Sequence, residues 1–183
     1  MSIVTKTGDC GTTALMFNRR VPKWDDRVEA CGAVDELNAA LGFSRATAQE
    51  AWTRECLLAT QKDLFTLMGE LATAPEDVQR YTRDGFPRVT PALTARLDQA
   101  VRHLEDKLSA FSGWATPGES LHAAALDLAR TVCRRAERRV CHLHHTTQTG
   151  NPEIGVFLNR LSDLLWLLAR ASEAPPDSPA GGS

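Results

Sequence analysis

The chain has 183 residues, about the length of one domain, and 43% of them are hydrophobic, which is enough for a substantial core. Its 21 Lys and Arg residues nearly balance 23 Asp and Glu residues, and this net charge of −2 argues against a nonspecific nucleic-acid binder. Five cysteines without a CxxC pair, no signal peptide and no apolar run near the roughly 20 residues of a membrane span predict a reduced, cytoplasmic protein.

The first segment, residues 1–22, is rich in Thr, Gly and Arg and shows no helical period, so we expect an ordered or partly ordered loop. Within it, TKTGDCGTTAL (residues 5–15) combines Gly8 and Gly11 with Lys6 and four Thr hydroxyls. Such a loop can present backbone N–H groups to a phosphate, although it lacks the Walker A spacing. A flexible N-terminus is the alternative interpretation.

Three amphipathic helices are predicted next, because apolar side chains recur every three or four positions. The periodic positions are Val28, Cys31, Val34, Leu37 and Leu41, then Leu57, Gln61, Leu64, Met68 and Leu71, then Leu93, Leu97, Val101, Leu104 and Leu108. Residues 74–91, with three prolines and a glycine, are predicted to form a loop between the second and third helices.

Two more helices follow a break at FSGWATPGES (residues 111–120), one from about Ser120 to about His144 and one from Pro152. Their periodic positions are Leu121, Ala125, Leu128, Val132, Ala136, Val140 and Leu143, then Phe157, Leu161, Leu164 and Leu168. No strand-like alternation of useful length occurs. We therefore expect one all-α domain over residues 1–173, a five-helix bundle, followed by a disordered tail at 174–183.

The fourth predicted helix carries an unusual charge pattern in VCRRAERRVCHLHH (residues 132–145), where every cation other than histidine is arginine. Arg130, Arg134 and Arg138 are spaced by four and share one face, with Glu137 beside them. The planar guanidinium matches phosphate oxygens bidentately, whereas lysine would serve solubility equally well. The pattern favours a phosphate site; the alternative is a solvated face with local ion pairs.

Three other polar features are less specific. Asn159 lies in a strongly apolar helix and is a candidate for a ligand contact, whereas Asp35 is most simply a surface carboxylate. Cys141 and His145 are four apart and could share a metal ion, but no second ligand pair accompanies them. We therefore predict no protein-bound metal site.

Four stretches together resemble the PduO-type ATP:cob(I)alamin adenosyltransferases in order and spacing: TKTGDCGTT, VEACGAVDELNAALGF, ARTVCRRAERRV and FLNRLSDLLWLLAR. They cover most of the chain. The resemblance implies a ferritin-like five-helix bundle that assembles as a homotrimer, with active sites between subunits. It implies transfer of the 5′-deoxyadenosyl group of ATP to the Co(I) of cobalamin or a precursor corrinoid, releasing triphosphate and forming adenosylcobalamin.

The resemblance also implies roles for individual residues. By similarity, ATP would contact Thr5, Lys6, Thr7, Gly8, Thr13, Ala14, Lys23, Arg134, Arg135, Glu137, Arg138 and Asn159. Asp35 of one subunit would pair with Arg130 of its neighbour. Because cob(I)alamin is itself a strong nucleophile, the protein needs no nucleophilic side chain. Arg134, Arg138 and Lys23, with a bound Mg²⁺, would stabilise the departing triphosphate.

The corrinoid side departs from the family pattern at three positions. Trp114 stands where the family places an aromatic residue, typically Phe, below the corrin to exclude the lower cobalt ligand. Glu119 replaces a glycine, and Asp127 stands where relatives often carry His. A non-catalytic corrinoid carrier or nucleotide-sensing protein on the same fold is therefore the alternative function. The enzymatic reading would add a reductase and an adenosylcobalamin-dependent enzyme as partners.

Overall fold

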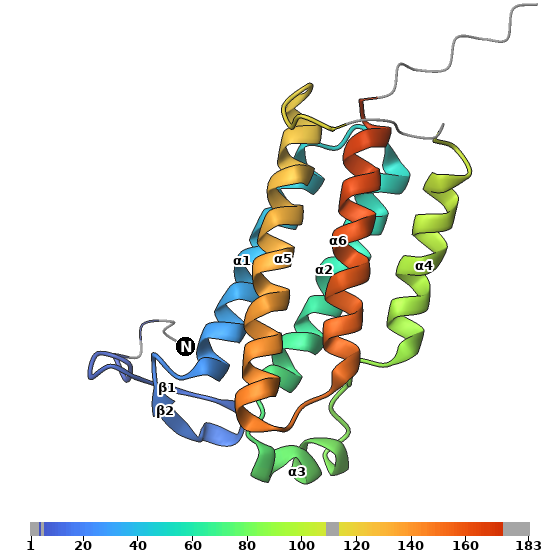
Figure 1. The fold of residues 1–183 in the computed structure, drawn as a ribbon. Coiled ribbons are helices and arrows are strands. Elements are labelled where there is room, and N and C mark those ends of the chain that lie inside the picture. Colours follow the sequence, from blue (N-terminus) through green and yellow to red (C-terminus); the bar gives the residue numbers. More distant parts are fainter. Residues whose placement is uncertain (1–3, 5, 109–113, 174–183) are drawn as a thin grey trace, which may run out of the picture.

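The computed structural model describes residue 4, residues 6–108 and residues 114–173, and Figure 1 shows that it is mostly helical. The predicted five-helix bundle is confirmed. Its long helices are α1 (Asp26–Thr47), α2 (Ala51–Leu71), α4 (Pro91–Glu105), α5 (Leu121–Thr147) and α6 (Pro152–Ala171). Thr5 and the tail at 174–183 lie outside the described residues, so the contact predicted for Thr5 and the disorder predicted for the tail stay predictions.

Short elements occur in both segments that the sequence predicted as loops. The N-terminal segment contains the strands β1 (Thr12–Ala14) and β2 (Arg20–Pro22), antiparallel with Thr13 opposite Val21, and the 3₁₀ turn η1 (Met16–Asn18). The second loop contains the 3₁₀ turn η2 (Pro75–Asp77) and the helix α3 (Val78–Arg83). Elements of three to six residues are too short for hydrophobic periodicity to indicate.

The helix ends follow local capping chemistry. The side chains of Asp25, Ser120 and Asn151 accept hydrogen bonds from backbone N–H groups in the first turns of α1, α5 and α6, at 2.8 Å, 3.1 Å and 3.1 Å. The α4 helix ends at Glu105, earlier than the predicted pattern to Leu108. The C-terminus of α5 lies where Gln148 adopts a left-handed conformation with φ of 51°.

The core lies between α1, α2, α5 and α6, with α1 packed against α2 and α5, and α6 packed against α5 and α4. Fully buried leucines and Phe157 fill it. Two core positions predicted on α5 are wrong, because Leu121 and Leu128 are 69% and 54% exposed. The buried stripe of α5 instead includes Leu126, Ala129 and Cys133, which turns the core-facing side away from both leucines.

The β1–β2 hairpin packs against α3 at one end of the bundle, whereas the chain enters α5 at the opposite end (Figure 1). The Met16 N–H donates to the Ala72 carbonyl at 2.9 Å, and Arg19 forms an ion pair with Asp77 at 2.8 Å. The Arg80 guanidinium lies 4.2 Å from the centre of the Phe17 ring. The hairpin is thus held by the segment that follows α2.

Candidate active site

The predicted phosphate loop is built on the hairpin, and Lys23 lies directly against it. The Lys23 N–H donates to the Gly11 carbonyl at 2.9 Å, and Gly11 has a φ of 75° that favours glycine. A Cβ atom on Gly8 would lie 3.3 Å from both Cε and Nζ of Lys23. The lysine ammonium and the backbone of Gly8 are therefore neighbours, as a shared phosphate site requires.

Arg20 organises this loop, although no pattern in the sequence indicated it. Its Nη2 donates to the Thr7 carbonyl at 2.7 Å and to the hydroxyl of Thr12. Thr13 and Ala14 follow on β1, opposite Val21 and Arg20. The sequence signal was only an arginine in a segment without a helical period, and it gains meaning once the strand register places Arg20 beside the loop.

Two arginines of α5, Arg134 and Arg138, form an exposed ridge, a name we use for this pair only. Among the residues that the structure describes, neither guanidinium forms an ion pair or a hydrogen bond. Their neighbours behave differently, because Arg135 pairs with Glu36 and Arg139 pairs with Glu29 at 3.0 Å. The ridge therefore presents two exposed positive charges with open donor groups.

Glu137 and Asn159 meet beside the ridge. The Asn159 amide on α6 donates to Oε1 of Glu137 on α5 at 3.2 Å. Within the described chain, no hydrogen bond engages the second carboxylate oxygen of Glu137. Both residues are among the ATP contacts that the family resemblance implies, and the structure brings them together on adjoining helices.

Arg130 lies on the same helix but belongs to a buried ion cluster. Asp127 accepts from Arg130 Nε at 3.0 Å and from Arg170 Nη2 at 2.5 Å. The side chains of Asp127 and Arg170 are each only 4% exposed, and Arg170 also pairs with Glu173 at 2.9 Å. Arg130 thus has a carboxylate partner within its own chain, whereas Asp35 is exposed on α1.

Trp114 is fully exposed at the end of the bundle opposite the hairpin. Leu121 and Leu128, which are also exposed, follow it on α5. No described part of this chain buries the indole, so it does not serve as packing for the bundle core. Within the described residues, Lys6, Gly8 and Lys23 form no hydrogen bond or ion pair with the ridge.

The cysteines provide no activated nucleophile in the core. All five are free thiols. Burial raises the pKa of Cys31 to about 12 and that of Cys56 to about 11, and it raises the pKa of Cys133 still further. In the described ranges, no group of three or more His, Cys, Asp or Glu side chains is arranged to hold a metal ion.

Comparison with known proteins identifies the family. The sequence model of the cobalamin adenosyltransferases matches residues 3–172. This chain belongs to that family. It is 40% identical to the corrinoid adenosyltransferase of Citrobacter freundii over 96% of this chain and 97% of the relative. It is also 40% identical to the corrinoid adenosyltransferase PduO of Salmonella typhimurium, of which it spans only 50%.

Solved structures of the family show the same fold. A phenylalanine-to-alanine variant of a PduO-type ATP:corrinoid adenosyltransferase from Lactobacillus reuteri, complexed with cobalamin and ATP, has a TM-score of 0.84 and 32% identity. That comparison covers 94% of this chain and 93% of the relative. An arginine-to-lysine variant complexed with ATP has a TM-score of 0.82 and 30% identity. The PduO-type family predicted from four sequence stretches is confirmed. None of the described helices is long and apolar enough to cross a membrane.

Proposed function

We propose that this protein transfers the 5′-deoxyadenosyl group of ATP to the Co(I) of cobalamin or a precursor corrinoid. The observation that carries the proposal is the ridge, because Arg134 and Arg138 have no carboxylate partner in the described part of the chain, on a helix whose other arginines are paired. Two unpaired guanidinium groups four residues apart suit a polyphosphate. Relatives of this family have been solved with ATP and with cobalamin.

The reaction needs a leaving-group site more than a catalytic base. The electron pair of Co(I) forms the new bond to the ribose 5′ carbon, and the bond from that carbon to the triphosphate oxygen breaks. The triphosphate departs with that electron pair, so negative charge grows on the bridging oxygen. Lys23, Arg134 and Arg138 are cations suited to stabilise this charge without moving. The loop around Gly8, next to Lys23, would hold phosphate oxygens of the nucleotide with backbone N–H groups.

Mg²⁺ fits this proposal as a partner of the triphosphate. Phosphate oxygens and water are its usual ligands, and it needs only one or two carboxylates from the protein. Glu137 is the carboxylate that fits, since Asn159 occupies only one of its oxygens. When bound, Mg²⁺ would neutralise part of the triphosphate charge.

A homotrimer is part of the proposal, with each site shared by two subunits. Support comes from an exposed apolar surface on α1 and α5. Phe43, Leu121 and Leu128 are all about half exposed or more. In this arrangement Asp35 would reach Arg130 of the neighbour and share it with Asp127. Sedimentation of wild type and Asp35→Ala tests this: loss of the trimer supports the pairing, and an unchanged trimer contradicts it.

Trp114 is proposed to contact the corrinoid. A flat apolar ring against the lower face of the corrin would exclude water and the nucleotide-loop base from cobalt. The full exposure of the indole supports this role, because burial usually stabilises tryptophan and no described part of this chain buries it. The free thiols of all five cysteines support a cytoplasmic location, which we also propose.

One assay tests the function. The protein is mixed with ATP, Mg²⁺ and chemically reduced cobalamin, and both the cobalt–carbon spectrum and triphosphate are followed. We expect the two products in equal amounts. If ATP and corrinoid bind but no triphosphate forms, the protein is instead a corrinoid carrier or nucleotide sensor. Such a protein keeps the fold without the chemistry.

A further inference from the structure

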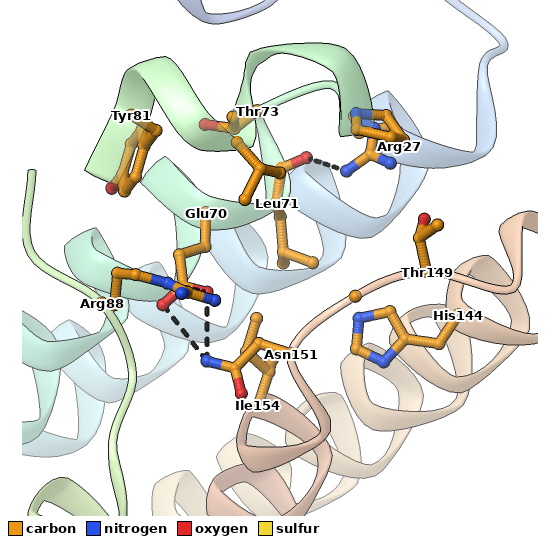
Figure 2. A pocket seen from close by; sticks show the side chains of 13 residues that line it. Arg27, Glu70, Leu71, Thr73, Tyr81, Arg88, His144, Thr149, Asn151 and Ile154 are labelled. Carbon is orange, nitrogen blue, oxygen red and sulfur yellow. Dashed lines mark hydrogen bonds and ion pairs between the residues drawn. The ribbon is translucent and has the colours of Figure 1, made fainter. Parts of the chain in front are cut away.

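A cavity of about 290 Å³ lies near the hairpin end of the bundle, apart from the ridge. Figure 2 shows Arg27, Thr149 and His144 around one side of it, and Glu70, Arg88 and Asn151 around another. It is enclosed by the end of α2, by η2 and α3, and by the turn between α5 and α6. The role proposed for the ridge and hairpin loop uses none of these side chains.

Within the described residues, Arg88 forms an ion pair at the cavity and Arg27 does not, although Asp25 and Glu76 act on the Arg27 guanidinium from a greater distance. Glu70 is compensated three times, because Asn151 donates to both of its oxygens at 3.3 Å and 3.1 Å, the Val89 N–H donates to one, and Arg88 lies 3.5 Å away. Arg27 has only a carbonyl: its Nη1 donates to the Leu71 oxygen at 2.9 Å. Over the described ranges, Arg27 forms no ion pair.

Burial affects both basic groups at this side of the cavity. Desolvation lowers the pKa of the Arg27 guanidinium. It also lowers the pKa of His144, and the charge of Arg27 lowers it further. An anion placed between Arg27 and His144 would relieve this unfavourable environment and accept their hydrogen bonds. The polar side of the cavity therefore matches an oxyanion.

The rest of the cavity is apolar. Leu71, Val78 and Ile154 line it, with the ring of Tyr81. One wall is tightly packed, because a Cβ atom on Gly150 would fall 2.2 Å from Cδ2 of His144, and Gly150 has a φ of 136°. A ligand with an anionic head and a short hydrocarbon body matches this division better than a bare inorganic anion.

The segment formed by η2 and α3 lines the cavity and also contacts the hairpin that carries Gly8. Pro75, Val78 and Tyr81 belong to η2 and α3, the segment that holds the hairpin through Arg19–Asp77 and Arg80–Phe17. Arg27 also lies in the first turn of α1, directly after β2 and Lys23. A ligand that orders this segment would therefore order the hairpin that carries Gly8 and Lys23.

We propose that this cavity binds a small organic carboxylate, with its head at Arg27 and its apolar body against Leu71 and Ile154. Its occupancy increases affinity for ATP by fixing the hairpin. The binding of the carboxylate stands on the cavity alone, whereas the effect on ATP rests on the function proposed above.

Calorimetry with hexanoate, without ATP, tests the site. We expect hexanoate to bind in the millimolar range, and its neutral counterpart hexanamide to bind at least about tenfold more weakly, a typical loss for a charged hydrogen bond. Arg27→Gln should reduce hexanoate affinity at least as much. Val78→Trp, which keeps Arg27 and fills the cavity from a partly exposed position, should abolish binding. Arg83→Gln, on the same short helix but outside the lining, should bind hexanoate as wild type does.

Each contrary result has a distinct meaning. Absence of hexanoate binding at tens of millimolar, or equal affinity in wild type and Val78→Trp, overturns the site. If Arg27→Gln only lowers the melting temperature and binds hexanoate normally, Arg27 is merely the cap of α2. If inorganic phosphate binds as tightly as hexanoate, the apolar body plays no part and the carboxylate class is wrong. Saturating hexanoate should tighten ATP binding about fivefold or more; an unchanged ATP affinity overturns the coupling but leaves the site.

Discussion

The five arginines of α5 form two groups although they share one helix. Arg130, Arg135 and Arg139 each pair with a carboxylate, whereas Arg134 and Arg138 have none within the described chain. The difference arises from neighbouring positions. Glu29 and Glu36 on α1 reach the side of α5 that carries Arg135 and Arg139, and Asp127 reaches Arg130. Arg135 and Arg139 join α5 to α1, Arg130 pairs within α5, and the unpaired arginines are open to a ligand.

This division bears on the two interpretations of the arginine face. Arg135 and Arg139, which are about half exposed, form ion pairs with Glu36 and Glu29 of α1 rather than local pairs within α5. The phosphate site is our proposal for the ridge. Mutations should separate the two groups by what they change: stability for the paired residues and activity for the ridge.

The largest expected effect is on stability, at Asp127. Its carboxylate is buried between Arg130 and Arg170, so Asp127→Asn leaves Arg170 buried without its nearest anion. We expect the free energy of unfolding to fall by about 3–5 kcal/mol, measured by urea denaturation. Glu173→Gln, at the more exposed end of the same cluster, is the control and should cost less. Equal and small losses for both variants would show that the cluster is not a buried unit.

The next effect is on activity, at the ridge. Arg134→Lys keeps the positive charge but loses the bidentate geometry of the guanidinium. Transition-state stabilisation should therefore fall by about 1.5–3 kcal/mol, which lowers kcat/KM roughly 10- to 150-fold. The unfolding free energy should stay close to that of wild type because Arg134 is exposed and unpaired. Arg139→Lys is the matched control, since it can keep its pair with Glu29. A similar loss of activity in both variants contradicts the division.

The sequence predicted the long helices because each buries a stripe of apolar residues over about four or more turns. It also placed Arg134, Arg138, Glu137 and Asn159 in one site. It did not distinguish the ridge from Arg135, because that distinction depends on Glu36, which lies 99 residues away in the chain and next to it only in the fold.

Buried charge and short strands were missed for related reasons. Asp127 has the sequence character of a surface carboxylate, and its burial follows from the return of α6 with Arg170. Leu121 and Leu128 fit the helical period, but periodicity cannot show which side of a helix other helices cover. Arg20 acquires its role only through the pairing of two three-residue strands.

A third prediction extends the comparison to the corrinoid end. Trp114→Ala should slow the reaction from cob(II)alamin with a reductant by roughly tenfold or more, which corresponds to an increase of about 1.4 kcal/mol in the activation free energy. The affinity for ATP should stay unchanged. Trp114→Phe should keep much of the activity. Electron paramagnetic resonance with ATP and cob(II)alamin should show a four-coordinate Co(II) signal in wild type that the alanine variant lacks. Identical five-coordinate spectra in both would remove Trp114 from the corrinoid site.

The smallest expected effect concerns Arg135, which resemblance to the family included among the ATP contacts. Glu36→Gln breaks an ion pair whose side chains are 49% and 60% exposed, so the unfolding free energy should change by no more than about 0.2–1 kcal/mol. Raising the salt concentration should shrink even that difference, because exposed charges are screened. Activity decides the assignment. If Arg135 serves only to join α5 to α1, freeing it leaves kcat/KM unchanged. If kcat/KM rises severalfold in Glu36→Gln, the freed guanidinium has joined Arg134 and Arg138 at the triphosphate, and Glu36 restrains it in the wild type. In that case the ridge has three members and the carboxylate of α1 sets its strength.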